Sequence, residues 1–363
     1  MRKLVMLVTP ALGFSLCSRE RTFTGVTSIA SVTSVTSQRG SPRGAAMAIT
    51  FDRSDLQRVV AVINNKGGVG KTTLCANIGG ILAEAGWRVL IVDLDPQGNL
   101  ALDLGYRHSE GDDGGEGLSK SLLFGDAVKP VKNVRPNLDV VPGGSEVEFI
   151  DKGLGPRMSQ SGDVAVAARL SLAKALAPVG ANYDVILLDC PPNTDAVQMI
   201  AIAAARYFLI PAKADDASIE GLTLTARRSD KVLDINPDID LLGVVNFASS
   251  TSAKNVRKEF ADDVVKALNG EEARATVFES YVRHSEATAK AARAKGLLVH
   301  ELDKSVKNGE KWYEALRRGV KHVSPGPQSA GNVADSLYAV TQEFIARLTQ
   351  KEEETAQEVT VNA

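Results

Sequence analysis

A nine-residue segment around position 70 has the residue types and the spacing that bind phosphate groups. Its sequence is Asn65-Lys66-Gly67-Gly68-Val69-Gly70-Lys71-Thr72-Thr73, between an apolar stretch and a segment of helical length. Glycines let a backbone approach phosphate oxygens closely, and amides at the start of the following helix form an anion site. Lys71 can reach the β- and γ-phosphates, and Thr72 can offer its hydroxyl to Mg²⁺. The segment therefore predicts a phosphate loop for a nucleotide and its magnesium ion.

The loop departs from the strict pattern GxxxxGK[ST] at its first position. Asn65 stands where that pattern has glycine, and a second lysine, Lys66, follows it directly. Taken alone, Lys66 could be a solvated loop lysine. A chance glycine-rich turn is the alternative for the whole segment, but three glycines and Lys-Thr between a strand and a helix favour phosphate binding.

Three carboxylates follow apolar stretches that could bring them beside this loop. Asp93 and Asp95 open the segment Asp93-Leu94-Asp95-Pro96-Gln97-Gly98-Asn99, and Asp189 directly follows the apolar residues 185–188. A carboxylate at the end of an apolar strand beside a phosphate loop is placed to hold the Mg²⁺ shell, which favours Asp189. Asp93 is expected near the same shell. Asp-Pro-Gln-Gly-Asn is also favourable turn chemistry, so a purely structural turn is the alternative there.

The elements that must position these residues follow an alternating pattern. Apolar stretches predict buried strands at 59–63, 89–92, 185–188, 208–210 and 241–245, and helix-length segments lie at 72–85, 164–176 and 195–205. Continuous apolar strands separated by helices are typical of a mostly parallel sheet with helices on both faces, so the fold class is α/β. Apolar residues at helical spacing predict a last amphipathic helix over 333–348.

One α/β domain over residues 51–350 is the simplest division of the 363 residues. Residues 1–50 are expected to be a disordered extension, or to reflect a true start at Met47; the alternatives are a weak signal peptide or a transit peptide. Residues 351–363 form an acidic, polar tail that is expected to fray.

Composition argues against nucleic-acid binding through overall charge, against a fold built on cysteines and against a transmembrane helix. The chain has 42 Lys and Arg against 44 Asp and Glu, for a formal net charge of −2, so nucleic-acid binding would need a local patch. Its three cysteines, Cys17, Cys75 and Cys190, are far apart, which argues against a disulfide framework or a structural zinc site. No apolar run approaches the ~20 residues of a transmembrane helix.

Several of these segments resemble one family. KGGVGKTT, with its early lysine, resembles the deviant Walker A motif of the ParA/MinD family of P-loop ATPases. The segment at 93–99 resembles that family's DxDPQGN segment, LLDCPP at 187–192 its hydrophobic-Asp-x-Pro-Pro segment, and residues 276–283 its C-terminal segment. The resemblance runs from about residue 59 to about residue 348, is closest to the ParA/Soj partition branch, and implies a P-loop NTPase fold.

The resemblance also implies roles for individual residues. Lys66 would reach the nucleotide of the partner subunit in a homodimer that closes around two ATP molecules. Asp95 would orient the attacking water, so Lys66, Lys71 and Asp95 are the expected catalytic residues, with Thr72, Asp93 and Asp189 around Mg²⁺. Pro211 and Asn246 are expected at the nucleotide; a strand-end asparagine such as Asn246 could equally be a turn residue.

The function that the resemblance implies is ATP-driven DNA partition in the cytoplasm, at the nucleoid. The ATP-bound dimer would bind nonspecific DNA, and a cognate centromere-binding, ParB-like protein would stimulate hydrolysis. Residues 254–295 contain nine Lys and Arg and seven acids, so the DNA patch is only mildly basic; Arg283, His284, Lys290, Arg293 and Lys295 lie within it.

Three other functions remain open. The alternative is a MinD-like positioning ATPase, but an acidic C-terminus does not suit an anionic membrane, so no membrane partner is expected. A redox member with an iron–sulfur cluster, or a metal-chaperone or arsenite-type ATPase, has little support from the cysteines. A nucleotide-binding protein without turnover is the fallback.

Overall fold

The computed structural model describes residues 51–249, 254–310, 312–319 and 324–361. The expectations for residues 1–50, a disordered extension or a start at Met47, lie outside this part of the chain. Within the described residues, no helix has the combination of length and apolar character that crossing a membrane requires.

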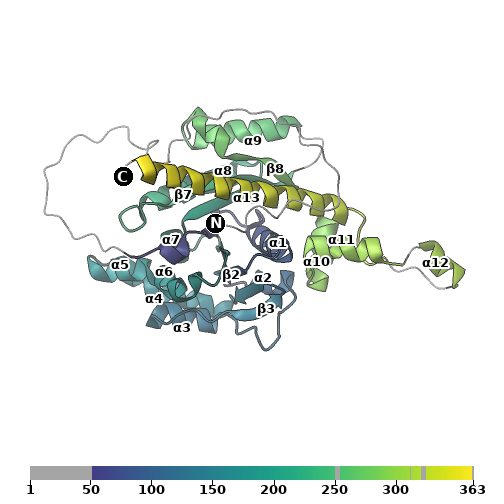
Figure 1. The fold of residues 1–363 in the computed structure, drawn as a ribbon, viewed down its shortest axis with the longest axis horizontal. Helices are drawn as coiled ribbons and strands as arrows, with labels where there is room; N and C mark the ends of the chain where they lie inside the picture. The colour runs from purple at the N-terminus through teal and green to yellow at the C-terminus, as the bar shows by residue number, and fades with distance from the viewer. Residues whose placement is uncertain (1–50, 250–253, 311, 320–323, 362–363) are drawn as a thin grey trace.

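A twisted eight-stranded sheet forms the centre of the described part of the chain (Figure 1). The strand order is β3-β4-β2-β5-β1-β6-β7-β8, and all neighbouring pairs are parallel except β3 and β4. The strands are β1 (Val59–Val62), β2 (Val89–Asp93), β3 (Val131–Arg135), β4 (Leu138–Val141), β5 (Val185–Asp189), β6 (Tyr207–Ala212), β7 (Asp240–Ser249) and β8 (Val277–Arg283). The predicted strands are confirmed as β1, β2, β5, β6 and β7, whereas β3, β4 and β8 were not predicted.

Helices cover both faces of this sheet. They are α1 (Lys71–Glu84), α2 (Asn99–Asp103), α3 (Glu116–Phe124), α4 (Glu148–Met158), α5 (Asp163–Arg169), α6 (Ser171–Gly180), α7 (Asp195–Ala204), α8 (Asp216–Asp230), α9 (Lys254–Ala267), α10 (Glu286–Lys295), α11 (Val299–Asn308), α12 (Trp312–Arg317) and α13 (Ala330–Val361). Short 3-10 helices are η3 (Ser54–Leu56), η4 (Ser145–Val147) and η5 (Glu271–Thr276). The predicted α/β class, with a mostly parallel sheet, is confirmed.

Each face of the sheet has its own hydrophobic core, because side chains alternate along a strand. In β1, Val59 and Ala61 join the core beneath α3–α9, whereas Val60 and Val62 join the core beneath α1, α2, α10, α11 and α13. α13 lies across the second face, and its buried residues include Val333 and Leu348, as the apolar spacing predicted (Figure 1).

Two predictions about local structure are wrong. The helix predicted over 164–176 is two helices, α5 and α6, which meet at the buried residue Leu170. The C-terminal segment does not fray at 351, because α13 continues to Val361. Lys351 binds Asp240 and Glu352 binds Arg58, so the acidic segment is held against the starts of β7 and β1.

Candidate nucleotide-binding site

The phosphate loop joins the carboxyl end of β1 to the start of α1, as predicted. Gly68 and Gly70 have φ angles of +72° and +92°, in the region that favours glycine. A Cβ on Gly70 would lie 2.2 Å from the Phe247 ring, whereas a Cβ on Gly67 or Gly68 would meet nothing within 4 Å. The loop therefore packs tightly against β7 at Gly70 and keeps an open cradle at Gly67 and Gly68.

A buried asparagine fixes the start of the loop. The Asn64 side chain donates to the Pro211 carbonyl at 2.9 Å and accepts the Lys66 amide at 2.9 Å. Gly221 lies so close that a Cβ there would come within 2.1 Å of Asn64 Oδ1. Pro211 therefore contacts the loop through Asn64, and it is not among the residues that line the cleft.

Lys71 is buried in the loop, as a phosphate-binding lysine would be. Its Nζ donates to the Lys66 carbonyl at 3.0 Å. Burial lowers the pKa of the Lys71 ammonium, and the nearby Asp189 carboxylate partly opposes this effect. The Lys71 ammonium is therefore a charge removed from water, which a bound phosphate would stabilise.

Thr72 and Asp189 form an incomplete polar site beside Lys71. Burial raises the pKa of Asp189 to about 7, although the neighbouring Thr72 hydroxyl acts to lower it. Both Asp189 carboxylate oxygens are buried, and neither makes a hydrogen bond of good geometry with a described residue. A hydroxyl and an unsatisfied carboxylate fit Mg²⁺, which takes oxygen ligands and usually one or two carboxylates together with phosphates.

Asp93 and Asp95 occupy different environments. Asp93 pairs in register with Asp189, and its Oδ1 accepts the Asp95 amide at 3.0 Å. Burial, together with the charge of Asp189, raises the pKa of Asp93 well above its usual value. Asp95 lines the cleft, while its Oδ1 accepts the Gln97 amide at 2.9 Å. Asp95 thus takes part in the turn and also faces the ligand space, whereas Asp93 does not line the cleft.

A cleft of about 900 Å³ opens in front of the loop. Its lining residues from the loop and the neighbouring segments are Gly67, Gly68, Gly70, Lys71, Thr72, Thr73, Asp95, Pro191, Lys213, Phe247 and Ala248. Asn246 is buried and its side-chain nitrogen has no partner among the described residues, but it does not line this cleft. Its role at the nucleotide base stays a prediction.

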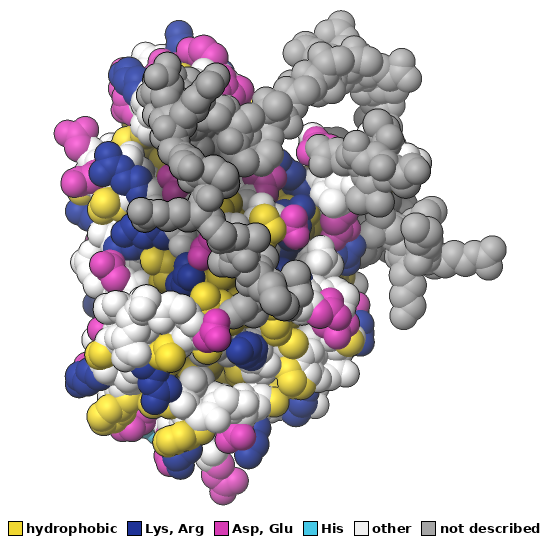
Figure 2. Space-filling view, turned by 90° about the vertical axis from the view of Figure 1, so that its left-hand side faces the viewer, with side chains coloured by type: hydrophobic (Ala, Val, Ile, Leu, Met, Phe, Trp, Pro, Cys, Tyr) yellow, Lys and Arg dark blue, Asp and Glu magenta, His cyan; other side chains and the backbone are white. Residues whose placement is uncertain are grey.

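The mildly basic segment forms the far wall of the same cleft. Arg283, His284, Lys290 and Arg293 line it. Arg293 binds Asp103 at 2.7 Å, and Lys295 donates to the Pro325 carbonyl, so part of this charge is used inside the molecule. On the face that carries α5, the side chains that the grey residues leave visible have both signs of charge interspersed (Figure 2).

Several residues at the site were not predicted. Phe247 packs on Gly70, and Asn77 lies one helical turn beyond Thr73, where its side chain donates to the Thr73 carbonyl at 2.8 Å. The i to i+4 spacing could have indicated Asn77. Phe247 gave no such signal, because a single aromatic residue at a strand end is usually a core residue.

Comparison with known proteins agrees with this geometry. A family model described as an AAA domain matches residues 57–241. The chromosome partitioning protein ParA of Caulobacter vibrioides (strain NA1000 / CB15N) is 34% identical over 224 residues, which cover 58% of this chain and 79% of that protein. The chromosome-partitioning ATPase Soj of Treponema pallidum is 32% identical over 276 residues, covering 72% and 96%.

A solved structure is also similar. Cobyrinic acid a,c-diamide synthase from Mycobacterium smegmatis, with bound ADP and magnesium, is 26% identical, with a TM-score of 0.52. The match covers 74% of this chain and 99% of that one. The fold, the phosphate loop with its early lysine, the carboxylates beside it and these relatives agree. The chain belongs to the ParA/Soj family of P-loop ATPases.

Proposed function

We propose that this protein is an ATP-dependent switch that acts in DNA segregation. ATP binding would close a homodimer, the dimer would bind DNA without sequence preference, and hydrolysis stimulated by a ParB-like centromere-binding protein would release it. The protein would then reside in the cytoplasm at the nucleoid. Support comes from the family and from the different environments of the two lysines of the loop.

The exposed position of Lys66 carries the dimer proposal. Its side chain is exposed and does not line the cleft of its own chain, whereas Lys71 is buried there. Lys66 nevertheless lies beside Gly67, at the mouth of the cradle. A second subunit facing this mouth would receive the Lys66 ammonium at its own nucleotide, and the two lysines would offset the charge of two facing triphosphates.

The remaining residues have separate roles in this proposal. The loop amides and Lys71 would hold the phosphates, and Asp95 would orient the attacking water. Thr72 and Asp189 would hold Mg²⁺, with Asp93 supporting Asp189 from within the sheet. A bound Mg²⁺ would offset the charge of the phosphates. Asn246, Phe247 and Ala248 would lie near the base.

DNA binding would be dominated by contacts to phosphates and therefore sensitive to salt. Of the basic residues at the far wall, Arg283 and Lys290 are the candidates, because Arg293 and Lys295 already bind groups of this chain. Because these residues line the nucleotide cleft, DNA binding at this wall would be linked to the ATP-bound, closed dimer.

The test compares Lys66→Gln with the wild type in sedimentation velocity with a non-hydrolysable ATP analogue. We expect the variant to bind the analogue as a monomer, with dimerisation, DNA binding and stimulated hydrolysis lost together. Lys129→Gln, at an exposed lysine far from the loop in sequence, is the matched control. A Lys66→Gln protein that still dimerises would make Lys66 an ordinary loop lysine and remove the main support for the dimer.

A further inference from the structure

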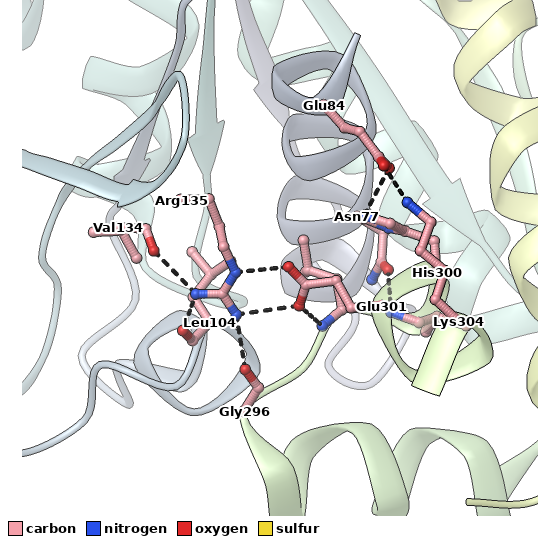
Figure 3. Close-up of polar contacts among 11 residues, drawn as sticks. Asn77, Glu84, Leu104, Val134, Arg135, Gly296, His300, Glu301 and Lys304 are labelled. Carbon is pink, nitrogen blue, oxygen red and sulfur yellow. Dashed lines mark hydrogen bonds and ion pairs between the residues drawn. The ribbon is translucent and has the colours of Figure 1, made fainter. Parts of the chain in front are cut away.

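Three helix ends meet at one arginine on the edge of the sheet. Arg135, the last residue of β3, donates to the Leu104 carbonyl at 3.0 Å, at the end of α2. It also donates to the Gly296 carbonyl at 2.9 Å, at the end of α10. Carbonyls at helix C-termini carry partial negative charge, so a guanidinium between two of them is well placed (Figure 3).

The third helix end is reached through a carboxylate. Arg135 binds Glu301 with two hydrogen bonds, of 2.7 and 3.2 Å. Glu301 Oε2 also accepts the Leu298 amide at 2.8 Å, at the start of α11. Each side chain of the ion pair is about a quarter exposed. The planar guanidinium thus makes four hydrogen bonds to groups on α2, α10 and α11, whereas a lysine has only three donors.

The ends of α2 and α10 also touch directly. Gly105 and Gly296 have φ angles of +70° and +60°, and a Cβ on Gly296 would lie 2.4 Å from Gly105 Cα. Just before these glycines, Asp103 at the end of α2 binds Arg293 of α10 at 2.7 Å. The two helices are therefore joined by backbone packing, by an ion pair and by Arg135.

Both joined helices belong to the nucleotide cleft. α2 begins directly after the turn that contains Asp95, and Asp103 lines the cleft together with Lys290 and Arg293 of α10. α11 is tied to the helix of the phosphate loop, because Asn77 Oδ1 accepts the Val299 amide at 2.9 Å and Lys304 binds Glu84 (Figure 3). Arg135 itself does not line the cleft.

We propose that Arg135 is a positioning residue that makes the Asp95–α2 segment and the α10–α11 wall move as one body. Through it, the effect of nucleotide binding at the loop is transmitted to the basic far wall. The inference rests on the proposed nucleotide site and adds a residue outside it. This role accounts for a guanidinium that contacts three helix ends instead of pairing with one carboxylate alone.

The experiment measures hydrogen–deuterium exchange of the full chain with and without ADP and Mg²⁺. In the wild type, ADP should slow exchange in α1 and also in α10–α11. In Arg135→Ala and Arg135→Lys, α1 should remain protected by ADP, whereas the ADP-dependent protection of α10–α11 should be lost. Glu301→Gln, which keeps the size of the side chain, should give an intermediate loss.

Arg88→Ala is the matched control. Arg88 also makes a two-bond ion pair, with Asp184, but it lies before β2 at the opposite end of the strands from the loop. Its removal should leave the ADP-dependent protection of α10–α11 unchanged. In ATPase assays of the Arg135 variants, kcat should stay within about twofold, because the phosphate loop and Asp95 are intact. KM for ATP should rise about fivefold, because the segments around the cleft are no longer coupled.

The outcomes separate the two proposals. If exchange in α10–α11 rises equally with and without ADP while the ADP-dependent difference survives, Arg135 is only structural and the inference is wrong. If ADP protects no segment of the wild type, the nucleotide site itself is wrong and the inference falls with it. Loss of the ADP-dependent difference in α10–α11 alone, with Arg88→Ala unaffected, supports the positioning role.

Discussion

Lys71 Nζ donates to the backbone carbonyl of Lys66 at 3.0 Å, so the two lysines of the phosphate loop are in direct contact while their side chains occupy different environments. The Lys71 side chain is buried in the loop, and the Lys66 side chain is exposed beside it. A shift of Lys71 toward a phosphate would release the Lys66 carbonyl. The position of Lys66 would thereby depend on whether the loop of its own chain is filled.

Lys71→Ala should abolish ATP binding. The variant lacks the desolvated charge that would offset the β- and γ-phosphates, and the loop amides alone form a weaker anion site. Titration with a fluorescent ATP analogue measures the affinity, and Lys129→Ala serves as the control at an exposed lysine. Unchanged affinity in Lys71→Ala would show that the phosphate loop was assigned wrongly.

Asp95→Ala should retain ATP binding and lose most hydrolysis. The loop and Mg²⁺ would hold the nucleotide, whereas Asp95 is proposed only to orient the water. The loss should be about 10²–10⁴-fold, the usual contribution of a positioned acid or base. Phosphate release and light scattering are measured together, and an ATP-trapped dimer with flat phosphate release is expected. Normal turnover would assign the role to another carboxylate.

A second variant at this position, Asp95→Asn, tests whether the turn alone explains Asp95. Asp95 Oδ1 accepts the Gln97 amide, so Asp95→Asn keeps an acceptor for the turn but removes the negative charge. We expect Asp95→Asn to keep the melting temperature of the wild type and to hydrolyse ATP as slowly as Asp95→Ala. Full activity in Asp95→Asn would mean that Asp95 serves only the turn.

The loop and its carboxylates could be predicted because their chemistry is local in sequence. Strand, glycines, lysine and threonine follow one another within about a dozen residues, Asp189 ends an apolar strand, and Asp95 lies just beyond the end of another. The parallel sheet then places these strand ends at one edge, and ligands of open α/β sheets bind in the crevice outside the carboxyl ends of the strands. The order of residue types was enough to place the loop and these strand ends at one edge of the sheet.

The parts that were missed depend on contacts between distant residues. Arg135 and Glu301 are separated by 166 positions, and Arg58 and Glu352 by 294. A lone arginine on a short edge strand has no periodic signal, and an acidic run predicts a solvated end unless its partner is known. For this reason the sequence indicated a frayed tail where the structure has a docked helix.

Glu352→Gln should lower the melting temperature by about 1–2 °C. The Arg58–Glu352 pair has two hydrogen bonds and each side chain is about a third exposed, so its loss should cost roughly 0.5–1 kcal/mol. Glu353 is exposed on the same helix and makes Glu353→Gln the matched control. Calorimetry that gives both variants the same melting temperature would show that the end of α13 is not held by this contact.

Asn64→Ala should weaken nucleotide binding more than its position outside the cleft suggests. The side chain joins the Lys66 amide to the Pro211 carbonyl, so its removal leaves a partly buried donor and a buried acceptor without this partner. Each such loss costs about 1–3 kcal/mol, and part of that cost can be relieved if the loop shifts away from the Lys66 position seen here. We therefore expect a lower free energy of unfolding together with a raised Kd for ATP.

A matched variant separates the loop effect from a general loss of stability. Asn236 is also buried, and its side chain donates to the Ile202 and Ala205 carbonyls, away from the loop. Asn236→Ala should lower the free energy of unfolding to a similar extent but leave the Kd for ATP unchanged, provided both are measured well below the melting temperature. If the two variants raise the Kd equally, the effect of Asn64→Ala is global destabilisation, and Asn64 has no particular hold on the loop. If only Asn64→Ala raises it, the contact between Asn64 and Lys66 is what keeps the loop ready for phosphate.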